Sequence, residues 1–121
     1  MLTNNDVLAN IPSVRARVTM VPDLRYPKRP NQARYMPHIV IGDPSQREAL
    51  KDGNRLTEHY LGVLVTDAPD ELCAGQSSEA TLVLMYWPAE KYIDVIPGAT
   101  FTLREGASIV GYGEVLSASA R

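Results

Sequence analysis

Residues 101–115 read FTLREGASIVGYGEV and carry the clearest structural pattern in the chain. Two alternating apolar and polar runs flank a Glu-Gly-Ala-Ser corner, which predicts two strands joined by a tight hairpin. Gly106 suits the first central position of a type II′ turn, which requires a positive φ. Gly111 and Gly113 lie two residues apart, so they share one face of the second strand. Glycine weakens a strand interior, so this pair predicts a close approach by another backbone or a large side chain where a barrel closes.

Period-two alternation continues upstream of this hairpin and predicts an all-β protein. The fold expected from six strands with polar turns is a closed, six-stranded antiparallel β-barrel. Within the fourth strand, Ala80, Leu82, Leu84 and Tyr86 are expected to share the inward face. The predicted strands occupy residues 14–20, 35–42, 59–67, 78–87, 100–105 and 108–116.

The 121 residues fit one domain, with a barrel core at about 14–116 and an N-terminal extension at 1–12. Three prolines in 22–34 predict an extended loop. One short helix of about two turns is predicted in the 43–53 connection. Asp43 would cap this helix, Pro44 would begin it and Gly53 would end it.

Charge is unevenly distributed along the chain, although the net charge is only −2. Residues 14–55 hold nine Lys and Arg against four acids, and residues 56–121 hold three against nine, so the two parts carry about +5 and −6. A globally basic nucleic-acid binder is excluded by this balance. The asymmetry predicts either a two-signed surface or, if the two parts interleave in one barrel, mutual neutralisation.

Cys73 is the only cysteine, so an internal disulfide is impossible, which fits a reducing compartment. The N-terminal sequence has neither a basic region nor a long apolar run, and the chain holds no apolar stretch of 18 residues. We therefore expect a cytoplasmic protein without a signal peptide or a membrane span.

The segment PGATFTLREGASIVGYGEV (97–115) resembles the C-terminal part of the third domain of elongation factor Tu and related translational GTPases. The shared features are the Pro-Gly entry, the apolar-x-apolar-Arg-Glu-Gly run and Val-Gly-x-Gly. Tyr35-x-Pro37 and EATLVLMYWPAE (79–90) also look like strands of that domain. The resemblance covers about residues 14–116 and implies a six-stranded antiparallel barrel.

The same resemblance raises expectations about partners. The chain has no phosphate-binding G-x-x-x-x-G-K-[ST] loop, so GTPase activity is not carried over. The family's third domain contacts the T-stem of aminoacyl-tRNA and a nucleotide-exchange partner, and the matching tRNA-contact positions are Glu105 and Gly106. Ala107 and Ser108 replace a Gly-Arg pair, and Trp87 replaces a basic or His residue. These departures weaken the expectation of tRNA binding, because phosphate affinity depends on cations.

Residue types that carry chemistry do not form a catalytic pattern, so we predict no catalytic residue, cofactor or metal site. Cys73 lies in a turn-like stretch without a known signature, and His38 and His59 are too dispersed for a metal-ligand motif. The acids Asp67, Asp70 and Glu71 suit a solvated turn, although such a cluster can also serve acid–base catalysis. A hydrolase that uses Cys73 or these acids stays an alternative.

The strongest binding candidates lie in the 25–35 loop, where cations alternate with aromatic rings. Arg and Tyr are enriched at protein interfaces, and together they can also hold phosphates and stack on bases. Trp87, beside a proline turn, is a second candidate anchor. The candidates are Arg25, Tyr26, Lys28, Arg29, Arg34, Tyr35, Trp87, Glu105 and Gly106.

The leading hypothesis is a non-enzymatic binding module that recognises a protein partner. In one form, a bacterial protein of this kind mimics the translation factor, for example as an immunity protein of a toxin system. The alternative is an accessory protein that binds RNA or tRNA through the basic loop. The sequence leaves the oligomeric state open.

Overall fold

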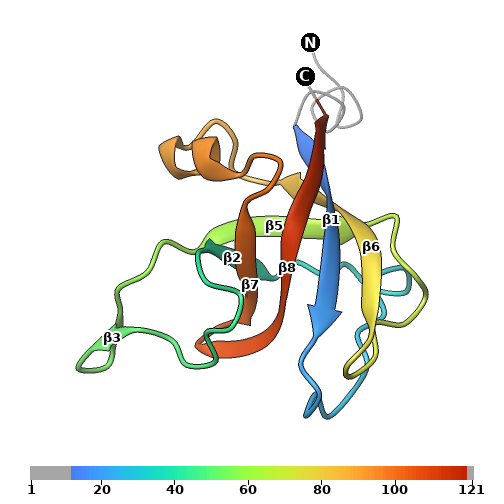
Figure 1. The fold of residues 1–121 in the computed structure, drawn as a ribbon, viewed down its shortest axis with the longest axis horizontal. Helices are drawn as coiled ribbons and strands as arrows, with labels where there is room; N and C mark the ends of the chain where they lie inside the picture. The colour runs from blue at the N-terminus through green and yellow to red at the C-terminus, as the bar shows by residue number, and fades with distance from the viewer. Residues whose placement is uncertain (1–11, 120–121) are drawn as a thin grey trace.

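The computed structural model describes residues 12–119, and its main body is a closed β-barrel (Figure 1). Its strands run antiparallel in the order β1-β6-β5-β2-β7-β8, and β8 pairs with β1 to complete the circle. The predicted all-β, six-stranded barrel is therefore confirmed, whereas the predicted N-terminal extension lies, but for Pro12, outside the described residues. The barrel strands are β1 (Ser13–Met20), β2 (His38–Ile41), β5 (Leu61–Thr66), β6 (Ser77–Leu84), β7 (Thr100–Glu105) and β8 (Ser108–Ser119).

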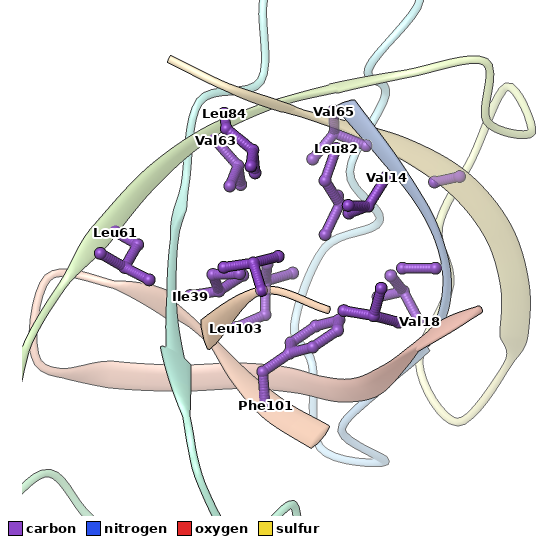
Figure 2. Packing of buried hydrophobic residues seen from close by; sticks show 14 of the residues in the cluster. Val14, Val18, Ile39, Leu61, Val63, Val65, Leu82, Leu84, Phe101 and Leu103 are labelled. Atoms are coloured by element: carbon purple, nitrogen blue, oxygen red, sulfur yellow. The ribbon is translucent and has the colours of Figure 1, made fainter. Parts of the chain in front are cut away.

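Alternate side chains of the barrel strands fill its interior, as the period of two requires (Figure 2). Phe101 is fully buried in this core, together with Val18 of β1, Leu82 of β6 and Leu103 of β7. The core cluster is made of apolar side chains, so hydrophobic burial stabilises the closed form. The other labelled members are Val14, Ile39, Leu61, Val63, Val65 and Leu84.

The two glycines of β8 lie at the contact between β8 and β1. Gly113 faces Val18, and Gly111 faces Met20. A Cβ atom on Gly113 would overlap the carbonyl oxygen of Arg17 and lie 2.8 Å from Cζ of Phe101. Neither glycine has a left-handed φ, so the requirement for glycine is one of space alone. The predicted close approach of backbone and large side chain is confirmed.

β8 also carries the two irregularities that let it contact both neighbours. Its register shifts against β1 between Arg15 and Ala16, where Leu116 is the extra residue. It shifts against β7 between Leu103 and Arg104, where Val110 is the extra residue. Bulges bend a strand and increase its twist. The last strand therefore bends on both sides of its glycine pair.

The β7–β8 hairpin has the predicted turn. Glu105 pairs with Ser108, which leaves a two-residue loop, and Gly106 at its first position has a φ of 60°. Ala107 has no positive φ, as a type II′ turn requires of its second position. The hairpin therefore sets the register of the strand that closes the barrel.

The helix predicted within residues 43–53 is wrong. Oδ1 of Asp43 accepts hydrogen bonds from N and Oγ of Ser45, at 2.8 and 2.7 Å, and so closes a turn. The chain then forms a small hairpin from β3 (Lys51–Asp52) and β4 (Arg55–Leu56), with Gly53 in its turn at a φ of 64°. Aspartate and glycine favour turns as well as helix ends, and in this segment Asp43 and Gly53 form turns. Figure 1 shows this segment as an arm beside the barrel.

The fourth barrel strand is shorter than predicted, and Tyr86 does not share its inward face. β6 ends at Leu84, where the amide of Trp87 bonds back to the Leu84 carbonyl, and Tyr86 is 63% exposed. Tyr92 is buried instead and lies in the 3₁₀ helix η1 (Glu90–Asp94). Its hydroxyl donates to the Gly62 carbonyl at 2.6 Å and fixes η1 against β5.

We expect Gly113→Ala to lower the free energy of unfolding by roughly 3 kcal/mol, because the added methyl group meets fixed backbone. The matched control is Gly62→Ala, whose Cβ would lie 2.5 Å from the ring of Tyr86. That exposed ring can rotate away, so the control should cost less than about 1 kcal/mol. Urea titration followed by circular dichroism measures both variants. Equal effects of the two substitutions would contradict the spatial role of Gly113.

Candidate functional site

An open groove of about 740 Å³ lies on one side of the barrel. It lies between the 21–28 loop, the 47–51 segment and the β7–β8 hairpin, and Ile109 and Val110 contribute apolar surface to it. We call it the hairpin groove. Its charged lining is mixed and consists of Arg25, Lys28, Arg47 and Lys51 with Asp23, Glu48 and Glu105.

One wall of the hairpin groove is held by three residues that the sequence put forward as binding candidates. Nζ of Lys28 lies 3.0 and 2.9 Å from the two carboxylate oxygens of Glu105. The hydroxyl of Tyr35 donates to the same carboxylate at 2.5 Å. Burial, together with the Glu105 carboxylate, raises the pKa of Tyr35, so the phenol keeps the proton that it donates. Lys28 and Glu105 therefore satisfy each other and shape the wall.

The opposite wall depends on a buried ion pair that the sequence analysis did not identify. Arg104 lies on the outer face of β7, yet its side chain is fully buried. Its guanidinium bonds both carboxylate oxygens of Glu58 at 3.0 Å, the hydroxyl of Tyr60 at 3.0 Å and Oγ1 of Thr102 at 2.8 Å. We call Arg104 and Glu58 the arm clamp, because they attach the 42–60 arm to the barrel.

The arm clamp extends to the residues that line the groove. The Glu58 carboxylate accepts a hydrogen bond from the amide of Leu50 at 2.8 Å and another from Nε2 of Gln46 at 2.9 Å. The Arg104 hydrogen bonds, with smaller contributions from Leu50 and Gln46, lower the pKa of Glu58 to about 2 although burial opposes the shift. Glu58 thus fixes the 46–50 segment on which one groove wall is built.

Arg47 is also occupied within its own wall. Its NH1 atom donates to the carbonyls of Pro44 at 2.6 Å and Gln46 at 2.8 Å, and its Cζ lies 4.5 Å from the centroid of the Tyr112 ring. This cation–π contact joins the arm to β8. Among the described residues, Arg25 and Lys51 are then the groove cations that have neither a carboxylate within 4.0 Å nor a cation–π contact.

The basic loop predicted as one binding element is divided by the fold. Arg25, Tyr26 and Lys28 line the hairpin groove. Arg29 instead pairs with Glu71 at 2.8 Å, and Arg34 lines a separate hollow beside β5. The division arises because Lys28 and Leu72 exchange backbone hydrogen bonds of 3.1 and 2.8 Å, which turn the loop at this point.

The remaining binding candidates lie in two turns. Gly106 is the first residue of the hairpin turn, and its neighbours Ala107 and Ser108 line the groove. Trp87 lies in the turn after β6, is 44% exposed, and does not line the groove. The hairpin candidates are therefore part of the groove, and Trp87 belongs to another surface.

The residues considered for catalysis are dispersed or have structural partners. Asp70 accepts a hydrogen bond from Asn31 at 3.0 Å, and the ring of His38 lies 5.9 Å from that of Tyr60. Cys73 is half-buried in a turn, where its carbonyl accepts a hydrogen bond from the amide of Gln76. Among residues 12–119, no three His, Cys, Asp or Glu side chains are grouped so that they could hold a metal ion. Among the contacts of residues 12–119, none joins Cys73 to a base that could activate it.

No protein-family model matches the chain, and a search of curated proteins found no match. Within the described residues, no helix has the length and apolar character needed to cross a membrane. The case for a function therefore rests on the hairpin groove and on the surfaces around it.

The arm clamp makes stability depend on pH. The folded pKa of Glu58 lies below its ordinary 4.5, so the clamp stabilises the protein fully above that pH and loses its effect as the pH falls towards 2. We expect Glu58→Gln to lower the free energy of unfolding by about 3 kcal/mol at pH 7. The difference from the wild type should narrow progressively below pH 4.5.

Glu114→Gln is the matched control, since Glu114 faces Arg17 at 3.6 Å on the exposed surface. Glu114→Gln should change the free energy of unfolding by less than about 0.5 kcal/mol both at pH 7 and below pH 4.5. Urea unfolding at a series of pH values measures these differences. A constant gap between wild type and Glu58→Gln from neutral to acidic pH would contradict the assignment.

Proposed function

We propose that this chain is a non-enzymatic binding module and that it recognises a protein partner through the hairpin groove. The observation that carries the proposal is the position of Tyr26, which is 72% exposed at a groove that Arg25 and Lys51 also line. Exposed Tyr and Arg beside apolar surface are the side chains that dominate protein–protein binding energy. The groove offers all three in one place.

The two fixed walls support this proposal further. Lys28 with Glu105 holds one wall, and the arm clamp with Arg47 holds the other. A preformed groove does not have to order its own backbone on binding, which reduces the entropic cost of association. The groove is therefore suited to recognition by a rigid surface rather than by folding around the partner.

Charge favours a protein over RNA as the partner. Acidic residues alternate with the groove cations, and two of the basic loop residues, Arg29 and Arg34, lie outside the groove. Affinity for RNA increases with the number of cations that contact phosphates, so this division weakens an RNA site. A protein surface with charges of both signs can complement such a lining.

The resemblance of residues 97–115 to the third domain of elongation factor Tu remains part of the proposal. It is supported by the antiparallel barrel of six strands and by the role of Gly111 and Gly113 in closing it. We propose a stand-alone barrel of this type that works in the bacterial cytoplasm, where Cys73 stays reduced, and that binds a component related to translation.

The protein-partner hypothesis predicts capture that depends on the groove. Immobilised wild-type chain should retain one protein from a bacterial lysate in near-stoichiometric amount. The double variant Arg25→Glu/Lys51→Glu should retain at least about tenfold less, because each reversal places a like charge against the partner. Arg34→Glu, a cation outside the groove, is the control and should capture normally. Quantitative mass spectrometry measures all three, and the absence of a stoichiometric partner would contradict the proposal.

The RNA alternative has a separate test. We expect fluorescence anisotropy with labelled tRNA to show no specific binding between about 50 and 200 mM salt. Binding that falls steeply over this range, and that is lost in Arg25→Glu/Lys51→Glu, would replace the protein partner by RNA. Arg34→Glu again serves as the control for a cation outside the groove.

A further inference from the structure

A second surface lies on the connection between β6 and β7, away from the hairpin groove. Four of the seven large hydrophobic side chains exposed in the described part of the chain occur here. Contiguous apolar patches on the surface of a monomeric protein often mark interaction sites, which makes this connection a candidate for one. The four residues are Tyr86, Trp87, Ile93 and Ile96, with exposures of 63, 44, 71 and 57%.

In and just after η1, buried and exposed side chains each recur every three residues, which is the period of a 3₁₀ helix. Tyr92 and Val95 point inward and are 2 and 5% exposed. Ile93 and Ile96, each one residue further along, are exposed and form what we call the η1 ridge. Figure 1 shows η1 standing outside the barrel wall.

The η1 ridge is displayed on a fixed support. The hydroxyl of Tyr92 bonds the Gly62 carbonyl at 2.6 Å and accepts the amide of Tyr86 at 3.3 Å. After η1, the amide of Gly98 donates to the Val115 carbonyl at 2.8 Å, which attaches the end of the connection to β8. The ridge therefore keeps its shape without a partner, and little conformational entropy is lost when it binds.

A hollow of about 270 Å³ lies next to η1 and has an apolar floor. Val40, Ile41 and Leu61 contribute this apolar part. The polar lining consists of Lys91 and Asp94 of η1 together with Glu58, which Arg104 already pairs, and His59. The protein thus carries two exposed isoleucines on or next to η1 and a partly apolar hollow that one cation and one anion of the same element line.

We propose that this surface binds a second copy of the chain across a two-fold axis. In a two-fold contact, each feature of one copy meets its counterpart on the other in both directions. The η1 ridge of each copy then occupies the hollow of its partner. Lys91 of each copy faces Asp94 of the other, so these two charges of η1 complement each other across the axis, while Glu58 is already neutralised by Arg104.

The choice of a second copy follows from this self-complementarity. A nucleic acid would meet Asp94 as well as Lys91 and gain no net attraction. The hairpin groove shares no lining residue with this hollow, so a dimer formed here leaves the groove open. Dimerisation would present two grooves to a partner and raise the apparent affinity for any partner that has two matching sites.

Sedimentation equilibrium of the whole chain between about 1 and 500 µM should show a monomer–dimer equilibrium in the micromolar range. Ile93→Asp should raise the dissociation constant at least about 100-fold, because it buries a charge in the partner's hollow. Tyr26→Ala alters an exposed aromatic residue of the hairpin groove and should leave the dissociation constant of the dimer unchanged. Ile93 is exposed, so the variant should unfold at the same urea concentration as the wild type.

Charge reversal tests the two-fold geometry itself. Lys91→Glu and Asp94→Lys should each raise the dissociation constant at least about tenfold, since each places two like-charge pairs across the axis. An equimolar mixture of these two variants should form a heterodimer, because both contacts across the axis then join opposite charges. The substituted acid of one copy meets the substituted lysine of the other, and the unchanged Asp94 meets the unchanged Lys91. The double variant Lys91→Glu/Asp94→Lys should dimerise as the wild type does.

Three results would overturn the proposal. The first is a wild-type chain that stays monomeric throughout the concentration range. The second is a dimer that persists with Ile93→Asp, and the third is a mixture of the single-charge variants that forms no heterodimer. A monomeric chain that co-sediments with phosphatidylcholine vesicles, and loses this binding in Ile93→Asp, would assign the ridge to a lipid surface instead.

Discussion

The contact between β1 and β8 is the constraint on which the rest of the structure depends. A barrel closes only when its first and last strands come within hydrogen-bonding distance along their length. Here the Arg17 carbonyl and the Phe101 ring occupy the volume that a side chain at position 113 would need. Gly111 and Gly113 leave that volume empty, and the two bulges of β8 bend the strand to follow β1.

A second interaction determines where the longest of these loops lies. The outer face of β7 would ordinarily meet water, but the 42–60 arm covers it, and Arg104 is buried there against Glu58. A buried ion pair is costly to break because the remaining charge loses its partner. The Glu58 carboxylate also accepts a hydrogen bond from the amide of Leu50. The Arg104–Glu58 pair therefore holds one side of the hairpin groove at a fixed position on the barrel wall.

Two surfaces of different character result from this arrangement. The hairpin groove combines apolar surface with charges of both signs and is bounded by residues from three separate parts of the chain. The η1 ridge is aliphatic, and the hollow next to η1 combines apolar residues of β2 and β5 with charged residues. Both stand on backbone that is hydrogen-bonded to the barrel, so a single rigid body presents them. The two surfaces have no lining residue in common.

The sequence alone was enough to predict the barrel, the approximate positions of its six strands and the purpose of the β8 glycines, because these follow from local periodicity and from the absence of a side chain. It also identified Tyr26, Arg25, Lys28 and Glu105, which the fold brings to one groove. It did not predict the arm clamp, since nothing near Glu58 in the chain indicates that a β7 residue 46 positions away will reach it. From the sequence, Arg29 and Arg34 were expected to act together with Arg25. The Lys28–Leu72 bridge turns the chain, so that Arg29 pairs with Glu71 and Arg34 lines a separate hollow. These points depend on the tertiary structure, because ion pairs and grooves join residues that are close in space but distant along the chain.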